Sequence, residues 1–247
     1  MSRWKASGIH LLISIAVGVC VLALLFGVWY PSPYFAASGG QELLLVLLGV
    51  DIVLGPLLTL IVFKSGKKSL RFDLGVIAAL QAGALIYGLH VITEARPVFI
   101  VWAVDRFTVV AANQIDPKDL AEGGRPEFRS LAWTGPRIVA ARLPSDSKER
   151  TDLAFSGLAG KDVESFPRYY VDYASEVPTL LLRARPLADL RRRGERASRE
   201  IDAWLAAHGR AESAVVWLPV LARHASVSML LDAQSGTPLA ALAIDPW

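Results

Sequence analysis

Three apolar runs, each about as long as a lipid bilayer is thick, constrain this chain more than any other feature. They are residues 9–30, 43–63 and 74–92, and Asp51 in the second run is the only Asp, Glu, Lys or Arg within them. An α-helix rises 1.5 Å per residue, so about 20 apolar residues cross about 30 Å of hydrocarbon. The sequence therefore predicts three transmembrane helices in residues 1–96, followed by a polar domain in residues 97–247.

The composition agrees with this division. The chain is 53% hydrophobic and 20% charged, whereas soluble domains are about 25% charged. Residues 1–96 hold seven Lys and Arg against four Asp and Glu, and residues 97–247 hold nineteen of each. The basic excess therefore flanks the apolar runs and does not indicate nucleic-acid binding. Cys20 is the single cysteine, which excludes a disulfide scaffold and a zinc module.

Basic residues in the short links predict the orientation of the helices, because Lys and Arg mark the cytoplasmic side. Arg3 and Lys5 precede the first run, residues 31–42 contain no Lys or Arg, and residues 64–71 contain four. This pattern predicts a cytoplasmic N-terminus and a C-terminal domain on the outer face of the membrane. Three spans without disulfides fit a bacterial inner membrane, in which this domain is periplasmic, although composition alone leaves other membranes open. A cleaved signal peptide is the alternative, but residues 9–30 are longer than the apolar region of about 7–15 residues that such a peptide has.

Polar residues within the second and third runs are candidates for packing or partner contacts. Asp51 lies near the predicted midplane, and Gln81 lies within about 5 Å of the same depth. Their hydrogen bond could lock two helices together, which we favour, or Asp51 could contact another membrane helix or form a proton-linked site. Gly55 and Pro56 are expected to kink the second helix, and Thr59 could satisfy a carbonyl that the proline leaves free.

Small residues recur every four positions in the third run, at Gly75, Ala79 and Gly83. Such a stripe lets another helix approach closely. The favoured interpretation is that it packs this chain's own helices, and the alternative is that it receives a transmembrane helix of another protein. Asp73 is expected in the first turn of this helix, where a carboxylate complements the helix dipole.

The C-terminal part predicts an α+β domain with an antiparallel sheet, because strand patterns stand at both ends of a helical middle. Residues 168–183 are ambiguous between helix and strand. The predicted helices are residues 147–157 and 187–208, the second with a glycine stop at Gly209. The predicted strands are residues 98–104, 107–112, 138–143, 214–220, 225–231 and 238–244.

No reaction centre is evident in this domain. His208 and His224 lack metal-ligand spacing, and the sequence has no nucleophile elbow and no glycine-rich phosphate loop. We therefore expect a protein that is not an enzyme and has no cofactor or metal. The arginine-rich residues 191–196 could bind phosphate or anionic lipid, but a solvated helix face is favoured because acidic residues are interleaved with the arginines.

Several motifs together resemble the TfpX/TfpZ family of type IV pilin accessory proteins, most specifically the Asp-x-x-x-Gly-Pro-Leu-Leu-Thr stretch from Asp51 to Thr59. The resemblance covers about the first 110 residues. The other matching positions are Trp4-Lys5-Ala6, His10, Asp73, Gln81, Tyr87-Gly88, Arg96-Pro97 and Ala103-Val104-Asp105-Arg106-Phe107.

The resemblance implies an inner-membrane protein, without a known catalytic site, that binds or stabilises a cognate type IV pilin and supports pilus assembly or dynamics. On this hypothesis Arg96, Pro97, Asp105 and Arg106 are candidates for the junction between the membrane helices and the outer domain. A different class of function is a membrane-anchored periplasmic sensor or ligand-binding protein that acts through a partner. The sequence leaves the oligomeric state open.

Overall fold

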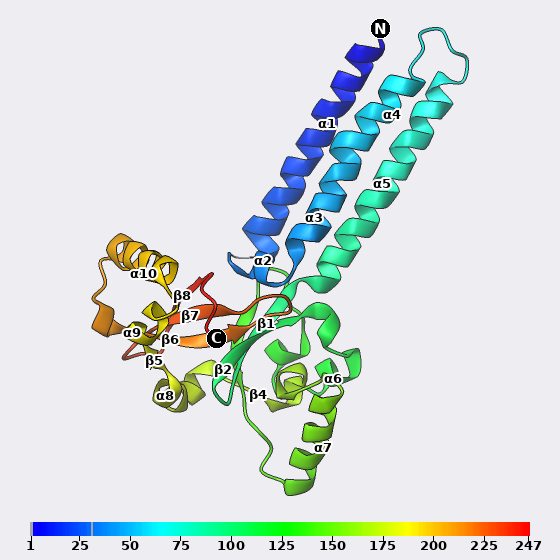
Figure 1. The fold of residues 1–247 in the computed structure, drawn as a ribbon. Helices are drawn as coiled ribbons and strands as arrows, with labels where there is room; N and C mark the ends of the chain where they lie inside the picture. Colours follow the sequence, from blue (N-terminus) through cyan, green and yellow to red (C-terminus); the bar gives the residue numbers. More distant parts are fainter. Residues whose placement is uncertain (1, 31) are drawn as a thin grey trace.

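A bundle of helices stands on a sheet domain (Figure 1). The computed structural model describes residues 2–30 and 32–247, so Pro31, with which the predicted outer link begins, lies outside the described residues. Short π-helical turns, η1 (Leu25–Trp29) and η2 (Val50–Leu54), interrupt the bundle. The α-helices of the bundle and of its outer link are α1 (Arg3–Leu24), α2 (Tyr34–Ala37), α3 (Gly40–Gly49), α4 (Gly55–Val62) and α5 (Leu70–Ala95).

Two of the three predicted spans are helices long and apolar enough to cross a bilayer, Arg3–Trp29 and Leu70–Ala95. The prediction for residues 43–63 is met only in part, because the apolar helix found there among the residues whose side chains are described, Leu47–Val62, falls short of the about 20 residues of a crossing. The described part of the chain thus contains two candidate spans rather than three. The described side chains do not include those of Glu42, Leu43 and Val46.

The outer domain is built on one mixed sheet with the order β4-β3-β1-β2-β6-β7-β8, and β5 pairs with β6. The predicted hairpin and the three C-terminal strands are all present. The strands are β1 (Pro97–Ala103), β2 (Arg106–Ala111), β3 (Arg137–Ala141), β4 (Tyr170–Val171), β5 (Arg185–Pro186), β6 (Val215–Leu221), β7 (Val227–Asp232) and β8 (Pro238–Leu242).

The prediction of an antiparallel sheet holds only in part, because β1 pairs parallel with β3 and β2 pairs parallel with β6. Parallel neighbours need a connection of a dozen or more residues. Residues 104–136 separate β1 from β3, and residues 112–214 separate β2 from β6. Both connections are long enough to return the chain to the same end of the sheet.

Helices pack around this sheet, and one predicted helix is divided. The predicted helix 187–208 breaks at Gly194, whose φ of 125° is incompatible with a continuous α-helix. Gly209, in the left-handed conformation, ends the second half as predicted. The described α-helices of the domain are α6 (Pro117–Ala121), α7 (Ser147–Leu158), α8 (Tyr173–Arg183), α9 (Leu187–Arg191) and α10 (Glu195–His208).

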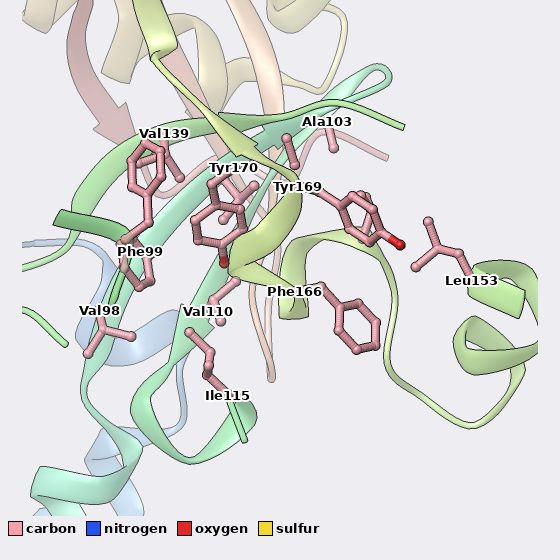
Figure 2. Packing of buried hydrophobic residues seen from close by; sticks show 14 of the residues in the cluster. Val98, Phe99, Ala103, Val110, Ile115, Val139, Leu153, Phe166, Tyr169 and Tyr170 are labelled. Atoms are coloured by element: carbon pink, nitrogen blue, oxygen red, sulfur yellow. The ribbon is translucent and has the colours of Figure 1, made fainter. Parts of the chain in front are cut away.

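Strand β1 is buried on both faces and therefore separates two hydrophobic cores. On one face Phe99 packs edge-on against Tyr170 at 5.1 Å between ring centroids, and Leu153 of α7 points toward Tyr169 (Figure 2). The other core contains the neighbouring β1 residues and two residues of α2, namely Ile100, Trp102, Tyr34 and Ala37. The link between the first two bundle helices thus takes part in the core of the outer domain.

Candidate functional site

Asp51 lies inside the bundle and contacts Gln81. Asp51 is 8% exposed, and Gln81 Nε2 lies 3.4 Å from both Asp51 Oδ1 and the Asp51 backbone oxygen. The backbone contact follows from Pro56. In the π-helical turn the Gly55 N–H donates to the Val50 oxygen, and the next residue, Pro56, has no N–H to offer the Asp51 oxygen. Gln81 therefore donates to an acceptor that the proline leaves free.

Gly55 makes this approach possible. A Cβ atom at position 55 would overlap the terminal amide of Gln81. Gly55 and Pro56 are both buried against the neighbouring helices. Asp51 thus faces this chain's own bundle, which is the arrangement that the favoured interpretation predicts.

Thr59 takes part in a different contact from the one predicted. Thr59 Oγ1 lies 2.6 Å from His10 Nδ1 of α1. This contact replaces the predicted hydrogen bond from Thr59 to a carbonyl that Pro56 leaves free. Ser7 of α1 instead donates to the Pro56 oxygen at 2.9 Å. Polar contacts therefore join the α4 region to α1 on one side and to α5 on the other.

The small-residue stripe faces away from the bundle. Gly75, Ala79 and Gly83 are exposed, and a Cβ atom at either glycine would meet no atom within 4 Å. The favoured interpretation, that the stripe packs this chain's own helices, is therefore not what the structure contains. The face of α5 that permits the closest approach of another helix is open.

Arg96 joins α5 to the outer domain. It is 4% exposed, and it donates through Nη1 to the Thr93 oxygen at 2.6 Å and through Nε to the Ala132 oxygen at 3.2 Å. Its guanidinium also lies 4.3 Å from the ring centre of Trp133. Burial lowers the pKa of Arg96, but an arginine stays protonated at any physiological pH. A positive charge at the C-terminal end of α5 complements the helix dipole.

The other three predicted junction residues lie at two different places. Pro97 begins β1 directly after Arg96 and is buried at the junction. Asp105 and Arg106 instead lie at the turn between β1 and β2, at the opposite end of a strand of seven residues. A strand rises about 3.3 Å per residue, so this hairpin carries its turn about 20 Å from the bundle. The prediction that Asp105 and Arg106 belong to the junction is wrong.

The outer link forms a second part of the junction, which no sequence pattern predicts. The Ala37 oxygen accepts hydrogen bonds from the backbone N–H of His224 at 2.9 Å and of Ala225 at 3.2 Å. Gly39 adopts a positive φ of 79°, and a Cβ atom there would overlap the His224 ring. Neither His224 nor Trp133 stands in a motif, so only their tertiary contacts identify them.

A cleft of 690 Å³ opens beside this junction, between the end of α5 and the β6–β7 loop. Tyr87, His90 and Glu94 line it from α5, and Arg223 and His224 line it from the loop. Tyr87 follows Gly83 at the four-residue spacing of the stripe. The open small-residue face of α5 therefore leads into this cleft, whose lining includes both apolar and polar side chains.

Among the described residues, no group of three or more His, Cys, Asp or Glu side chains is placed to hold a metal ion. The convergent polar groups of the cleft suit hydrogen bonding and ion pairing with a ligand or a protein partner.

Comparison with known proteins identifies the family. The chain is 36% identical over 186 residues to the "Fimbrial assembly protein, serogroup I" of Dichelobacter nodosus, and the alignment covers 74% of this chain and 72% of that protein. The chain belongs to the fimbrial assembly protein family. The serogroup E1 member from the same organism is 34% identical over 186 residues, with the same coverage. No solved structure matches the chain.

The fimbrial assembly family described as FimB matches residues 1–39. These residues comprise α1, the π-helical turn η1, α2 and the glycine that contacts His224. A further relative, "Fimbrial assembly protein, serogroups C1 and C2", is 38% identical over 113 residues, which is 45% of this chain and 86% of that protein. The comparisons support the fimbrial assembly protein family and not the narrower TfpX/TfpZ name.

Proposed function

We propose that this protein is an inner-membrane accessory factor of the TfpX/TfpZ type, which binds a cognate type IV pilin and supports pilus assembly. The names of its relatives support a role in fimbrial assembly. In this proposal residues 1–96 anchor the protein in the membrane, residues 97–247 form the periplasmic domain, and the function is not enzymatic.

Membrane insertion is supported by two helices of bilayer length and by the distribution of basic residues. The helical run from Gly40 to Val62 is the proposed middle span, because α3, η2 and α4 follow one another without a break. The short outer link lacks Lys and Arg, whereas the link before α5 is basic. The N-terminus is therefore assigned to the cytoplasm.

The observation that carries the proposal is the open stripe on α5, at Gly75, Ala79 and Gly83. A transmembrane helix can approach such a face closely, and van der Waals packing then stabilises the pair. The cleft at Tyr87 would receive the part of the partner that emerges from the bilayer. A pilin, with an apolar helix that continues into a periplasmic head, has the shape that this arrangement fits.

Photo-crosslinking in cells tests this proposal. A photoreactive amino acid at Ala79 or Gly83 is expected to capture the major pilin, since both positions lie on the open stripe. The matched control is Leu12 of α1, which is 68% exposed but lies on a different helix. Equal capture of pilin from Leu12 and Ala79, or no capture from either stripe position, would contradict the proposed binding face.

The cleft also supports a second candidate function, a periplasmic sensor that acts through a partner protein. Its lining combines Glu94, Asn113, Arg223 and His224 in one place, which is the kind of convergent polar surface that a ligand needs. The same crosslinking experiment separates the two functions. Capture of a signalling membrane protein in place of pilin would favour the sensor.

A further inference from the structure

An apolar groove lies at the outer end of the bundle, between the π-helical turn η1, the link helix α2 and the start of α3. It has a volume of 600 Å³, and Phe26, Phe35, Leu44 and Leu45 line it. Gln41 is one of its few polar lining residues. On the proposed membrane placement this groove is at the level of the outer leaflet, so its apolar walls suit hydrocarbon chains.

A basic cleft adjoins this groove. Ala243, which follows β8, lines both the apolar groove and a second cleft of 390 Å³. Arg193, Arg196 and Trp247 line the second cleft together with Asp245. In Figure 1, β8 lies between α10 and the outer end of the bundle. One surface thus passes from apolar side chains at the bundle to arginines at the start of α10.

The arginine surface extends further than this cleft. Arg193 also lines a neighbouring cleft of 500 Å³ together with Arg185 and Arg192. Each guanidinium group presents several N–H donors in a fork that matches phosphate oxygens. The cationic groups therefore form a continuous patch around Arg193.

Carboxylates near this patch leave most of these donors available. Arg192 Nη1 lies 3.4 Å from Asp189 Oδ1, and Arg196 Nε lies 2.8 Å from Glu200 Oε1. The two arginine side chains are 79% and 78% exposed, and ion pairs this exposed to water contribute little. An anion can therefore bind the free donors without first breaking a strong pair.

We propose that this surface binds an anionic phospholipid of the outer leaflet, with its acyl chains in the groove at Phe26 and Leu45 and its phosphate at Arg193 and Arg196. Hydrocarbon chains and a phosphate on one molecule complement the two parts of the surface, and Ala243 lies where they meet. Trp247 stands where an amphipathic ring suits the headgroup region. The inference rests on the proposed membrane placement but is independent of pilin binding.

The test uses the full-length protein in detergent, with bound lipid counted by native mass spectrometry. Phosphatidylglycerol is expected to bind at least about tenfold more tightly than phosphatidylcholine with the same chains. The double substitution Arg193→Gln and Arg196→Gln is expected to remove this preference. Arg199→Gln is the matched control, because Arg199 lies on α10, as Arg196 does, but outside both basic clefts. Ala243→Trp places a large side chain where the apolar groove and the basic cleft meet, and it is expected to weaken phosphatidylglycerol binding.

Three results would overturn the inference. The first is equal binding of the two lipids, and the second is loss of the preference for phosphatidylglycerol in the Arg199→Gln control. The third is that inorganic phosphate raises the thermal stability of the protein as much as phosphatidylglycerol does. A concentration-dependent dimer that Ala243→Trp abolishes would identify a second copy of the chain as the occupant instead. Alkali extraction of membranes measures insertion separately, so failure of lipid binding and failure of the membrane placement are distinguishable.

Discussion

At the residue scale, glycine positions show where the chain requires close contact and where it does not. Gly55 faces the Gln81 amide, which in turn contacts Asp51, whereas Gly83 faces open space on the same bundle. The two positions differ in what a methyl group would meet, although both lie inside helices. They are therefore a matched pair for testing the polar contact inside the bundle.

Gly55→Ala is expected to displace the Gln81 side chain and leave Asp51 without its partner, at a cost of about 1–3 kcal/mol in the free energy of unfolding. Gly83→Ala is expected to leave stability unchanged or to raise it slightly, because alanine favours a helix. Denaturant unfolding of the two purified variants in detergent measures the difference. Equal stability of the two variants would show that the contact of Gln81 with Asp51 contributes nothing.

At the element scale, the loop between β7 and β8 is held by Asp232. Asp232 Oδ1 accepts from the backbone N–H groups of Ser235 at 2.9 Å and Gln234 at 3.1 Å, and Arg210 donates to Oδ2 at 2.7 Å. These donors, with the Ser235 N–H contributing most, hold the pKa of the Asp232 carboxyl well below its usual value. The sequence predicted this hairpin, but not that one carboxylate organises its loop.

Because the pKa of Asp232 is lowered in the folded chain, its stabilising contribution is present above the unfolded-state pKa of about 4 and is lost as the pH falls through the folded-state value. Asp232→Asn is therefore expected to lower the melting temperature at neutral pH, and to differ less from the parent protein near about pH 3. Thermal unfolding across this pH range measures both effects. Asp152→Asn, at an exposed position of α7, is the control and should change neither.

At the scale of the whole molecule, the bundle and the sheet domain share one hydrophobic core and two sets of polar contacts. Tyr34 and Ala37 of the outer link pack in the core that contains Ile100 and Trp102. Arg96 binds the end of α5 to the loop at Ala132. We therefore expect the domain to be held in a defined orientation on the bundle.

Gly39→Ala is expected to separate the β6–β7 loop from the bundle, because a Cβ atom would overlap the His224 ring and the φ of 79° would be strained. The amide protons of His224 and Ala225, which donate to Ala37, should then exchange roughly tenfold faster. Gly66→Ala is the matched control, since Gly66 has a φ of 80° and open space around it. Unchanged exchange at His224 in the Gly39→Ala variant would contradict this account of the junction.

The sequence by itself determined the local elements of this protein. Hydrophobic periodicity and turn residues located the apolar helices α1 and α5, the β1–β2 hairpin and the three C-terminal strands. These features depend on neighbours close along the chain, so a single sequence contains their physical causes. The predicted depths of the two residues in the membrane also placed Gln81 near Asp51, because an α-helix rises by a fixed distance per residue.

Only the tertiary structure decided how these elements face one another. The mixed sheet arises from long connections whose paths are not encoded in local patterns. The outward orientation of Gly83 depends on which side of α5 meets the other helices. The four-residue spacing of the small residues does not by itself specify that side. The contact of Ala37 with His224 joins residues 187 positions apart in the sequence, and burial of a shared core, rather than any motif, brings them together.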